Sequence, residues 1–512
     1  MVVDRKKLHI VSLLFTRCLL IVSLIFSITI ENKALMGIMT ISPEEYNVLL
    51  SKESSEFDVE ILFNGIPAAT DEINNIIYIS EKIDDNSRIT DMAGTLSVSN
   101  PNYQLFFVED ESVENISENL AGRDKYKVIV MRPDETYTEY SVVFTTLPVL
   151  NINGIPTAED SVGRIIHTGK IQFFDSLSAE TGEYRTVSTN ASWRARGNST
   201  LIMTKKSWKI SLENNSGEKE NISFCGLGED DDWILNSMSF DDLCLREKLT
   251  MDLWNSDKIF IDNKAPMSRG EYVEVVYNGE YVGLYLLQRR LDKKYLNLDD
   301  NSILIKGNSV VVANPNIKYY EIEHSPYTEE ETISFLEKNF FSDITSNVNI
   351  ENLIETNIFI NMICATDNCL EKNIFRIIRN IDNNYEVNYL LWDTDMSFGM
   401  SWDESIGFIY DFDGMLTPIV YRYDFYDIIQ KKPTLETLIA KRWFELRNSI
   451  FSTENITTHV EELFNTITYS GSLQRDHDKW GLHYSGEDNM ENFYKYINMR
   501  MKFLDEYYSM YI

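Results

Sequence analysis

Alternating apolar and polar positions dominate the part of the chain that follows its N-terminal segment. From Phe57 to Leu147, runs such as VEILFN, YKVIVM and YSVVFTTL are separated by Asn, Asp, Gly and Pro. A period of two is typical of β-strands, and the separating residues favour turns. The pattern predicts a small all-β sandwich domain over residues 55–146. The preceding residues 32–54 are polar and compatible with a helix, and we interpret them as a linker.

A second β-rich region begins at Leu147 and later gives way to helical spacing. LPVLNINGIP opens a strand there, and YVEVVYNGEYVGLYLL has the pattern of a hairpin that turns at Asn278 and Gly279. After Ser325 the apolar residues recur at helical intervals, in TEEETISFLEKNFF, ENLIETNIFINMICA and THVEELFNTI. The sequence therefore predicts an α+β fold, with a large domain over residues 147–512 that is β-rich first and mainly helical afterwards.

The N-terminus has the pattern of an export segment. A basic start at residues 5–7 precedes an apolar run from Leu8 to Ile30. This arrangement is typical of a signal peptide, and the run is also close to the length that spans a bilayer. No small-x-small cleavage site is evident before Asn32, so residues 1–31 are either a removed signal peptide or a retained signal anchor. Both predict that the rest of the chain is extracytoplasmic, secreted or anchored to the cell surface by this segment.

The charge balance bears on partners. Lys and Arg number 47 against 80 for Asp and Glu, a formal net charge of −33. A chain of this charge repels polyanions, so we expect no nucleic-acid partner.

The cysteines are few. Cys18 lies in the leader, and the others are either two disulfides or, as we favour, single buried thiols. These others are Cys225, Cys244, Cys364 and Cys369.

Candidate chemistry is concentrated in segments far apart along the chain. RARGNST at 194–200 is followed by KKSWKISL, and the later segments are ATDNCLEKNIF at 365–375 and LLWDTDMSFG at 390–399. Phosphoryl transfer needs a cation against the phosphates, a carboxylate for the nucleophile's proton, and Asn and Asp side chains to hold magnesium. The segments supply these groups in that order. Asp393 and Asp395 alternate at a predicted strand end, so both carboxylates can reach one cation.

Eight ordered segments carry a resemblance to a known family: RGNST, KKSWKI, GEDDDWILNS, DDLCLREKL, YNGEYVGLYLL, DNCLEKNIF, WDTDMSFG and KRWFEL. Over roughly residues 147–510 the chain resembles the spore-coat protein H (CotH) kinase family. The resemblance implies an atypical protein-kinase-like catalytic domain that uses ATP with Mg²⁺ or Mn²⁺. It also implies phosphorylation of Ser or Thr on exported surface or coat proteins.

The resemblance also implies roles for individual residues. Asp367 would be the catalytic base, and Asn373 and Asp393 would hold the metal, with Asp395 as the second choice. Lys206 would bind phosphate. The RGNST turn would hold ATP beside it, through Arg196, Asn198 and Ser199.

Departures from the family pattern leave other functions open. Asn373 follows Asp367 by six residues where a kinase catalytic loop has five, with Asn368 as the alternative metal ligand. Gln288 stands where the family has a hinge-side Glu, and no Asp-Phe-Gly occurs. One alternative is therefore a catalytically inactive surface protein that binds or assembles. Another is a carbohydrate-active protein that uses paired acids.

Three further patterns have simpler interpretations. Lys205, Lys206 and Lys209 alternate along a strand-like stretch, so at least one of them is an ordinary solvated lysine. We interpret the acidic run 229–232 as a solvated turn because it lacks the spacing of a calcium loop. DFDG at 411–414 we interpret as a surface turn.

Overall fold

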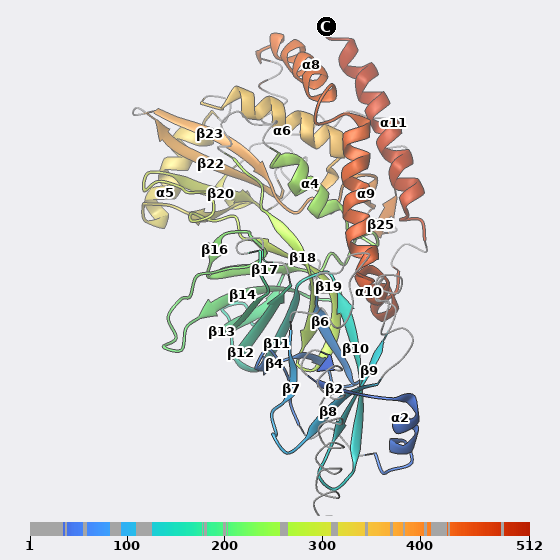
Figure 1. Cartoon of the computed structure of the whole chain (residues 1–512). Helices are drawn as coiled ribbons and strands as arrows, with labels where there is room; N and C mark the ends of the chain where they lie inside the picture. The colour runs from blue at the N-terminus through green and yellow to red at the C-terminus, as the bar shows by residue number, and fades with distance from the viewer. Residues whose placement is uncertain are drawn as a thin grey trace, which may run out of the picture.

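The computed structural model of the 512-residue chain is α+β and is arranged in tiers along one long axis (Figure 1). The predicted leader over residues 1–31 lies outside the described residues. In the part that is described, no helix is long and apolar enough to cross a membrane. The structure describes residues 34–35, 38–54, 59–81, 94–108, 125–176, 178, 182–197, 201, 203–256, 265–308, 316–343, 347–368, 372–381, 384–403, 407–410, 428, 431–482 and 486–512.

The N-terminal tier consists of two sheets. The seven-stranded sheet has the order β1-β2-β8-β9-β10-β6-β5, and the three-stranded sheet has the order β4-β3-β7. Their strands are β1 (Ala34–Leu35), β2 (Ile38–Ile41), β3 (Ile61–Phe63), β4 (Ile66–Pro67), β5 (Ala69–Asp71), β6 (Ile76–Ser80), β7 (Leu96–Val98), β8 (Gln104–Val108), β9 (Tyr126–Met131) and β10 (Tyr137–Thr145).

The segment interpreted as a linker contributes to this tier. Strand β2 pairs in parallel with β8, with Met39 opposite Phe106. Helix α2 (Pro43–Leu49) follows, and Ser42 and Glu45 form a capping box at its start. Residues 38–49 are therefore a strand and a helix that belong to the sheet region.

A closed barrel forms the middle tier. Its strand order is β11-β12-β13-β14-β17-β19-β18, and β11 and β18 close it in parallel. Alternate residues of its strands point inward into an apolar core that includes Trp193, Ile210 and Trp233. The barrel strands are β11 (Val149–Glu159), β12 (Ile165–Asp175), β13 (Arg185–Arg196), β14 (Ser207–Glu213), β17 (Asp232–Asn236), β18 (Gly270–Tyr277) and β19 (Glu280–Arg289), with the small pair β15 (Ile222–Ser223) and β16 (Glu229–Asp230) beside them.

The first two tiers share apolar packing. Tyr78 of β6 stacks on Tyr281 of β19 with ring centroids 4.4 Å apart, and Val149 and Phe174 of the barrel lie in the same buried cluster. The backbone amide of Glu72 also donates to the carbonyl of Gly279. The N-terminal sheets are therefore packed directly against the barrel.

The third tier combines a small sheet with helices, which gather beyond the barrel in Figure 1. The four-stranded sheet has the order β21-β20-β22-β23. Its strands are β20 (Ile303–Gly307), β21 (Tyr320–His324), β22 (Ile374–Ile381) and β23 (Asn384–Leu391), and a separate pair is β24 (Met400–Asp403) and β25 (Gly407–Tyr410). The helices are α4 (Arg246–Trp254), α5 (Glu329–Phe335), α6 (Ile350–Ile363), α8 (Thr434–Arg447), α9 (Thr453–Tyr469), α10 (Ser472–Trp480) and α11 (Met490–Ser509), with short helical turns at Ile317–Tyr319, Leu336–Phe340 and Thr366–Asn368.

Helix α10 ties the helical tier back to the barrel. Its Asp476 carboxylate pairs with the Lys205 ammonium at 2.7 Å and accepts the backbone amide of Leu284 at 2.9 Å. Gly283 allows this approach, because a Cβ there would lie 2.1 Å from Asp476 Oδ1 and its φ is +103°. The contact fixes α10 against strand β19.

The described cysteines support the thiol interpretation. Cys225, Cys244 and Cys364 are present as thiols, and Cys244 and Cys364 are buried. Cys18 and Cys369 lie outside the described residues.

Candidate active site

A cavity of about 490 Å³ lies between the outer wall of the barrel and the four-stranded sheet. Both walls carry charged side chains. The basic lining residues are Arg164, Arg194, Arg196, Lys209, Arg290, Lys306 and Lys372, and the acidic ones are Glu321, Glu323, Asp367, Asp393 and Asp395. Apolar lining comes from Ile234, Phe240, Leu291, Phe375, Trp392 and Met396.

Strand alternation explains the barrel wall of this cavity. Arg194 of β13 lies opposite Lys209 of β14, which in turn lies opposite Ile234 of β17. Their neighbours Trp193 and Trp233 point into the barrel core, so these three side chains point outward. The wall is therefore a row of cross-strand neighbours.

The opposite wall brings together residues that are far apart in sequence. Asn373 immediately precedes β22, and Asp393 is the second residue after β23. Ile374 pairs with Leu391 where these strands meet. The backbone amide of Trp392 donates to the carbonyl of Asn373 at 3.0 Å. The pairing of β22 with β23 thus places Asn373 and Asp393 at the same end of the sheet.

Asp367 lies in the short helical turn Thr366–Asn368 and holds two neighbours from the same loop. Lys372 Nζ lies 2.6 Å from each carboxylate oxygen of Asp367, and Asn373 Nδ2 donates to Oδ2 at 2.9 Å. A carboxylate held in this way keeps its orientation toward the cavity. Sequence reasoning missed Lys372, whose only signal was its place directly before Asn373.

Two of these residues have unusual backbones. Asn373 has φ +57° and Asp393 has φ +60°, in the left-handed region that non-glycine residues rarely adopt. Such conformations persist where the surroundings enforce them, often at functional sites.

Asn368 is not among the described residues that line the cavity. It supports the loop instead. Its side-chain amide is buried and donates to the carbonyls of Asn373 at 3.1 Å and Trp392 at 2.8 Å. Of the two asparagines considered as metal ligands, the cavity is lined by Asn373.

Acidic groups concentrate at the loop that follows β23. Burial raises the pKa of Asp395 well above its ordinary value, and the charge of Asp393 raises it further. Burial, followed by Asp393, also raises the pKa of Glu247 to about 7. Glu247, on α4, accepts hydrogen bonds from the amide and hydroxyl of Thr394 at 2.7 and 2.9 Å. Sequence reasoning missed Glu247 because its partner lies 147 residues away.

This concentration of acidic side chains fits a divalent cation, whose charge would favour their ionised forms. Among the described residues, no three His, Cys, Asp or Glu side chains form a complete metal site. Mg²⁺ needs no such site, because it is usually bound by one or two carboxylates together with water and substrate phosphates. Asp393 with Asn373 supplies oxygen ligands of that kind, and Asp395 lies beside them.

Comparison with known families gives a match to the model described as CotH kinase protein, over residues 193–504. The chain belongs to the CotH kinase family. The matched range includes the described lining residues from Arg194 to Met396, whereas Arg164 precedes it. A comparison with curated proteins found no match. The match begins within β13, so β11 and β12 precede it although they belong to the same barrel.

Of the candidate phosphate-binding residues of this CotH chain, some line the cavity and others do not. Arg196 lines the cavity, with its guanidinium 5.4 Å from the ring centre of Trp392, whereas Lys206 does not appear in the described lining. Lys206 Nζ donates to the carbonyl of Leu201, and Lys205 is buried with Asp476. Lys209 is the lysine of this stretch that lines the cavity. Asn198 and Ser199 lie outside the described residues.

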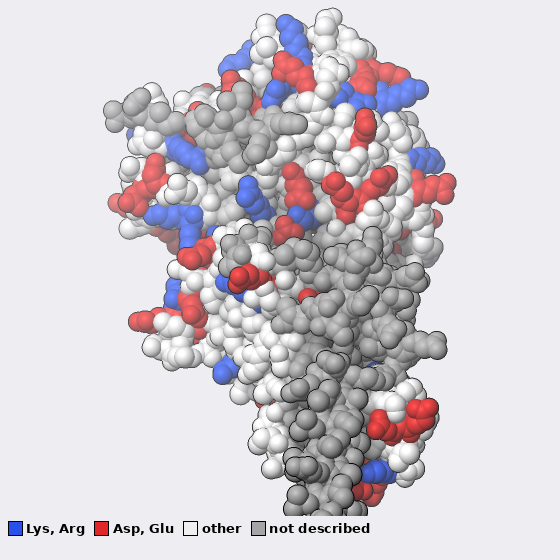
Figure 2. All heavy atoms as spheres, viewed as in Figure 1, with Lys and Arg blue, Asp and Glu red and all other residues white. Residues whose placement is uncertain are grey.

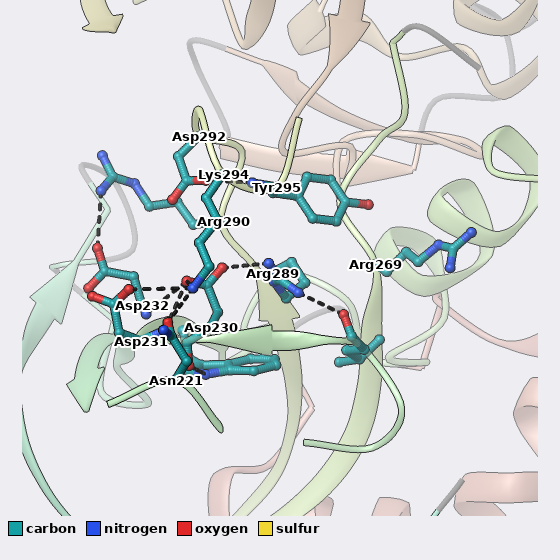
Figure 3. A network of polar contacts seen from close by, with 12 residues as sticks. Asn221, Asp230, Asp231, Asp232, Arg269, Arg289, Arg290, Asp292, Lys294 and Tyr295 are labelled. Atoms are coloured by element: carbon teal, nitrogen blue, oxygen red, sulfur yellow. Dashed lines mark hydrogen bonds and ion pairs between the residues drawn. The ribbon is translucent and has the colours of Figure 1, made fainter. Parts of the chain in front are cut away.

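The middle of the acidic run 229–232 is not the solvated turn that we expected, although Glu229 is exposed. Asp230 is 1% exposed, and it pairs with Arg289 at 2.5 Å and with Lys294 at 3.1 Å (Figure 3). Asp231 is also buried and pairs with Lys219 at 2.6 Å. The interpretation was wrong because the cations come from distant segments. The other predicted surface turn, residues 411–414, lies outside the described residues.

Gln288, which the family resemblance aligned with a hinge-side Glu, is buried in β19. It lies opposite Ile234 of β17, and the side-chain amide of Asn236 donates to its Oε1 at 3.5 Å. Since Ile234 and Asn236 line the cavity, Gln288 lies on the same outward face of the barrel, next to the described lining residues but not among them.

Proposed function

We propose that this protein is an ATP-dependent phosphotransferase that transfers the γ-phosphate to Ser or Thr of protein substrates. The observation that carries the proposal is the charge of the cavity. Among the described residues, seven basic and five acidic ones line it, in a chain that has 47 basic and 80 acidic residues. On the face shown in Figure 2, acidic and basic side chains are interspersed. A locally cationic wall facing a group of acids suits a polyphosphate bound with a divalent cation.

The lining residues suggest a division of roles. Asp367 would accept the proton of the substrate hydroxyl, and its contacts to Lys372 and Asn373 support this role by fixing its orientation. Asn373 and Asp393, with Asp395, would hold Mg²⁺ or Mn²⁺, which when bound neutralises phosphate charge. The cationic wall would orient the phosphates, and the apolar residues beside it suit a purine base.

The setting proposed for this reaction is extracytoplasmic, with surface or secreted proteins as substrates. The basic and apolar start of the sequence supports this setting. The same segment would anchor the protein to the membrane if it is retained.

The test is transfer of labelled γ-phosphate by the full-length chain to itself and to a generic protein substrate, with Mg²⁺ or Mn²⁺. We expect labelling on Ser or Thr that is lost when the cation is chelated. Cation-dependent ATP binding without any transfer would instead favour the inactive binding or assembly protein, which the six-residue spacing and the buried Gln288 motivate.

Lys209, in β14, and Lys206, directly before that strand, provide a further prediction. Lys209→Met should weaken ATP binding about tenfold or more, because it removes a charged contact from the cavity wall. Lys206→Met should have the smaller effect, because Lys206 Nζ is directed to the Leu201 carbonyl. Isothermal titration with a non-hydrolysable ATP analogue compares the two variants. A larger loss in Lys206→Met would restore the assignment that the family resemblance implied.

A further inference from the structure

Asp232 lies at the start of β17, beside the cationic wall of the cavity. Its Oδ2 pairs with Lys209 Nζ at 3.1 Å and with Arg290 Nη1 at 3.4 Å. Its Oδ1 accepts the hydroxyl of Ser211, the residue directly opposite it on β14, at 2.6 Å. One carboxylate, fixed by a cross-strand hydroxyl, therefore contacts two of the cations that line the cavity.

Arg290 is held from a second direction. Its Nη2 pairs with Glu323 Oε2 of β21 at 2.9 Å, while its Nη1 contacts Asp232. Arg290 directly follows β19, so its guanidinium bridges the barrel and the four-stranded sheet. The Arg290 and Lys209 side chains keep 34% and 25% of their surface exposed, which leaves both accessible from the cavity.

The two preceding acids have different partners. Asp230 contacts Arg289 and Lys294, and Asp231 contacts Lys219 and Lys294. Within the described part of the chain, none of these three cations lines the cavity. Figure 3 shows the three acids together with Arg289, Arg290 and Lys294. Of the three consecutive aspartates, Asp232 is thus the one whose cations face the cavity.

We propose that Asp232 is a positioning residue that holds Lys209 and Arg290 at the cavity wall, ready to bind the anionic end of a polyphosphate ligand. This inference rests on the proposed function for the identity of that ligand. Lysine and arginine side chains lose much rotamer freedom on binding, so prior fixation of their charged ends favours binding. Donors fixed before the ligand arrives also need no reorganisation during the reaction.

The experiment compares Asp232→Asn with Asp231→Asn in the full-length chain. Calorimetry measures binding of inorganic tripolyphosphate and of ATP with Mg²⁺, and steady-state kinetics gives KM for ATP and kcat. We expect Asp232→Asn to weaken both ligands about tenfold, mainly in KM, and Asp231→Asn to change them by less than about twofold. Asp232→Glu, which keeps the charge, should recover part of the loss, and the thermal midpoint of each variant shows that it is folded.

Several results would overturn the inference. If folded Asp232→Asn binds tripolyphosphate as tightly as the wild type, Asp232 positions nothing that the ligand uses. Tighter binding would mean that repulsion of phosphate by Asp232 outweighs its effect on the cations. An equal loss in Asp231→Asn would assign the effect to the stability of the whole acidic run. If the wild type binds neither ligand, the proposed function fails as well. If the wild type binds both ligands and Asp232→Asn binds them equally well, only this inference fails.

Discussion

Asp367→Asn is expected to reduce phosphate transfer by about 10²–10⁴-fold, the usual contribution of a general base. The substitution keeps the shape of the side chain but removes the carboxylate that would accept the hydroxyl proton. Lys372 loses its partner, but its side chain is 37% exposed, so water can solvate the ammonium. The loss should therefore appear in kcat, with ATP binding and the thermal midpoint nearly unchanged. Labelled γ-phosphate transfer and calorimetry on the same preparation measure these quantities.

Asp300→Asn is the matched control for this prediction. Asp300 also forms an ion pair with a lysine, at 2.8 Å to Lys293, but its side chain is 94% exposed. Exposed pairs contribute little to stability, so this variant should keep its activity. If Asp367→Asn retained more than about a tenth of the wild-type rate, Asp367 would not be the base, because general bases contribute at least about a hundredfold.

The sequence predicted the fold class well because its signals are local. The alternation from Phe57 to Leu147 corresponds to strands in the described residues, and the helical spacing after Ser325 corresponds to α5, α6 and α9. The joining of residues 38–41 to the N-terminal sheet was not predictable, because their partner β8 lies more than sixty residues further along the chain. Strand partners at such separations leave no periodic signal.

In the candidate site too, residues with a local sequence signal were predicted and those that depend on strand pairing were not. Asp367, Asn373 and Asp393 were found because each lies in a recognisable segment, and the structure brings them to one cavity. The choice between Lys206 and Lys209 depended on where β14 begins, and it begins at Ser207. A one-residue shift in how β14 pairs with its neighbours would exchange its two faces, so sequence alone could not decide which lysine faces the cavity.

The residues that sequence reasoning missed depend on distant contacts. In the sequence, Glu247 has no feature that distinguishes it from other helical acids. In the structure, its hydrogen bonds to Thr394 place it against the loop that carries Asp393 and Asp395. Asp230 was interpreted as solvated because Arg289, which neutralises it, lies 59 residues away. In both cases burial of a charged group followed from a partner that no local pattern reveals.

Asp488→Ala is expected to destabilise the fold by about 3–5 kcal/mol, the cost of removing one partner from a buried ion pair. The Arg246 side chain is 0% exposed, and its Nη2 and Nη1 donate to Asp488 at 2.8 and 2.9 Å. Asp241 also pairs with Arg246, through Nη1 and the backbone amide, whereas the contact of Asp488 to Nη2 would be lost. Urea denaturation followed by tryptophan fluorescence gives the free energy of unfolding.

The neighbouring Glu487→Ala is the control, because Glu487 is exposed and should change stability little. Asp488→Ala should also disturb the candidate active site. Arg246 Nε donates to the carbonyl of Ser397 at 3.0 Å, and Ser397 lies two residues after Asp395. Arg246 is also the residue before Glu247, which binds Thr394 in the same loop. Transfer activity at a temperature where Asp488→Ala remains folded should therefore fall, whereas full activity would show that the Arg246 network stabilises the fold without positioning the WDTD loop.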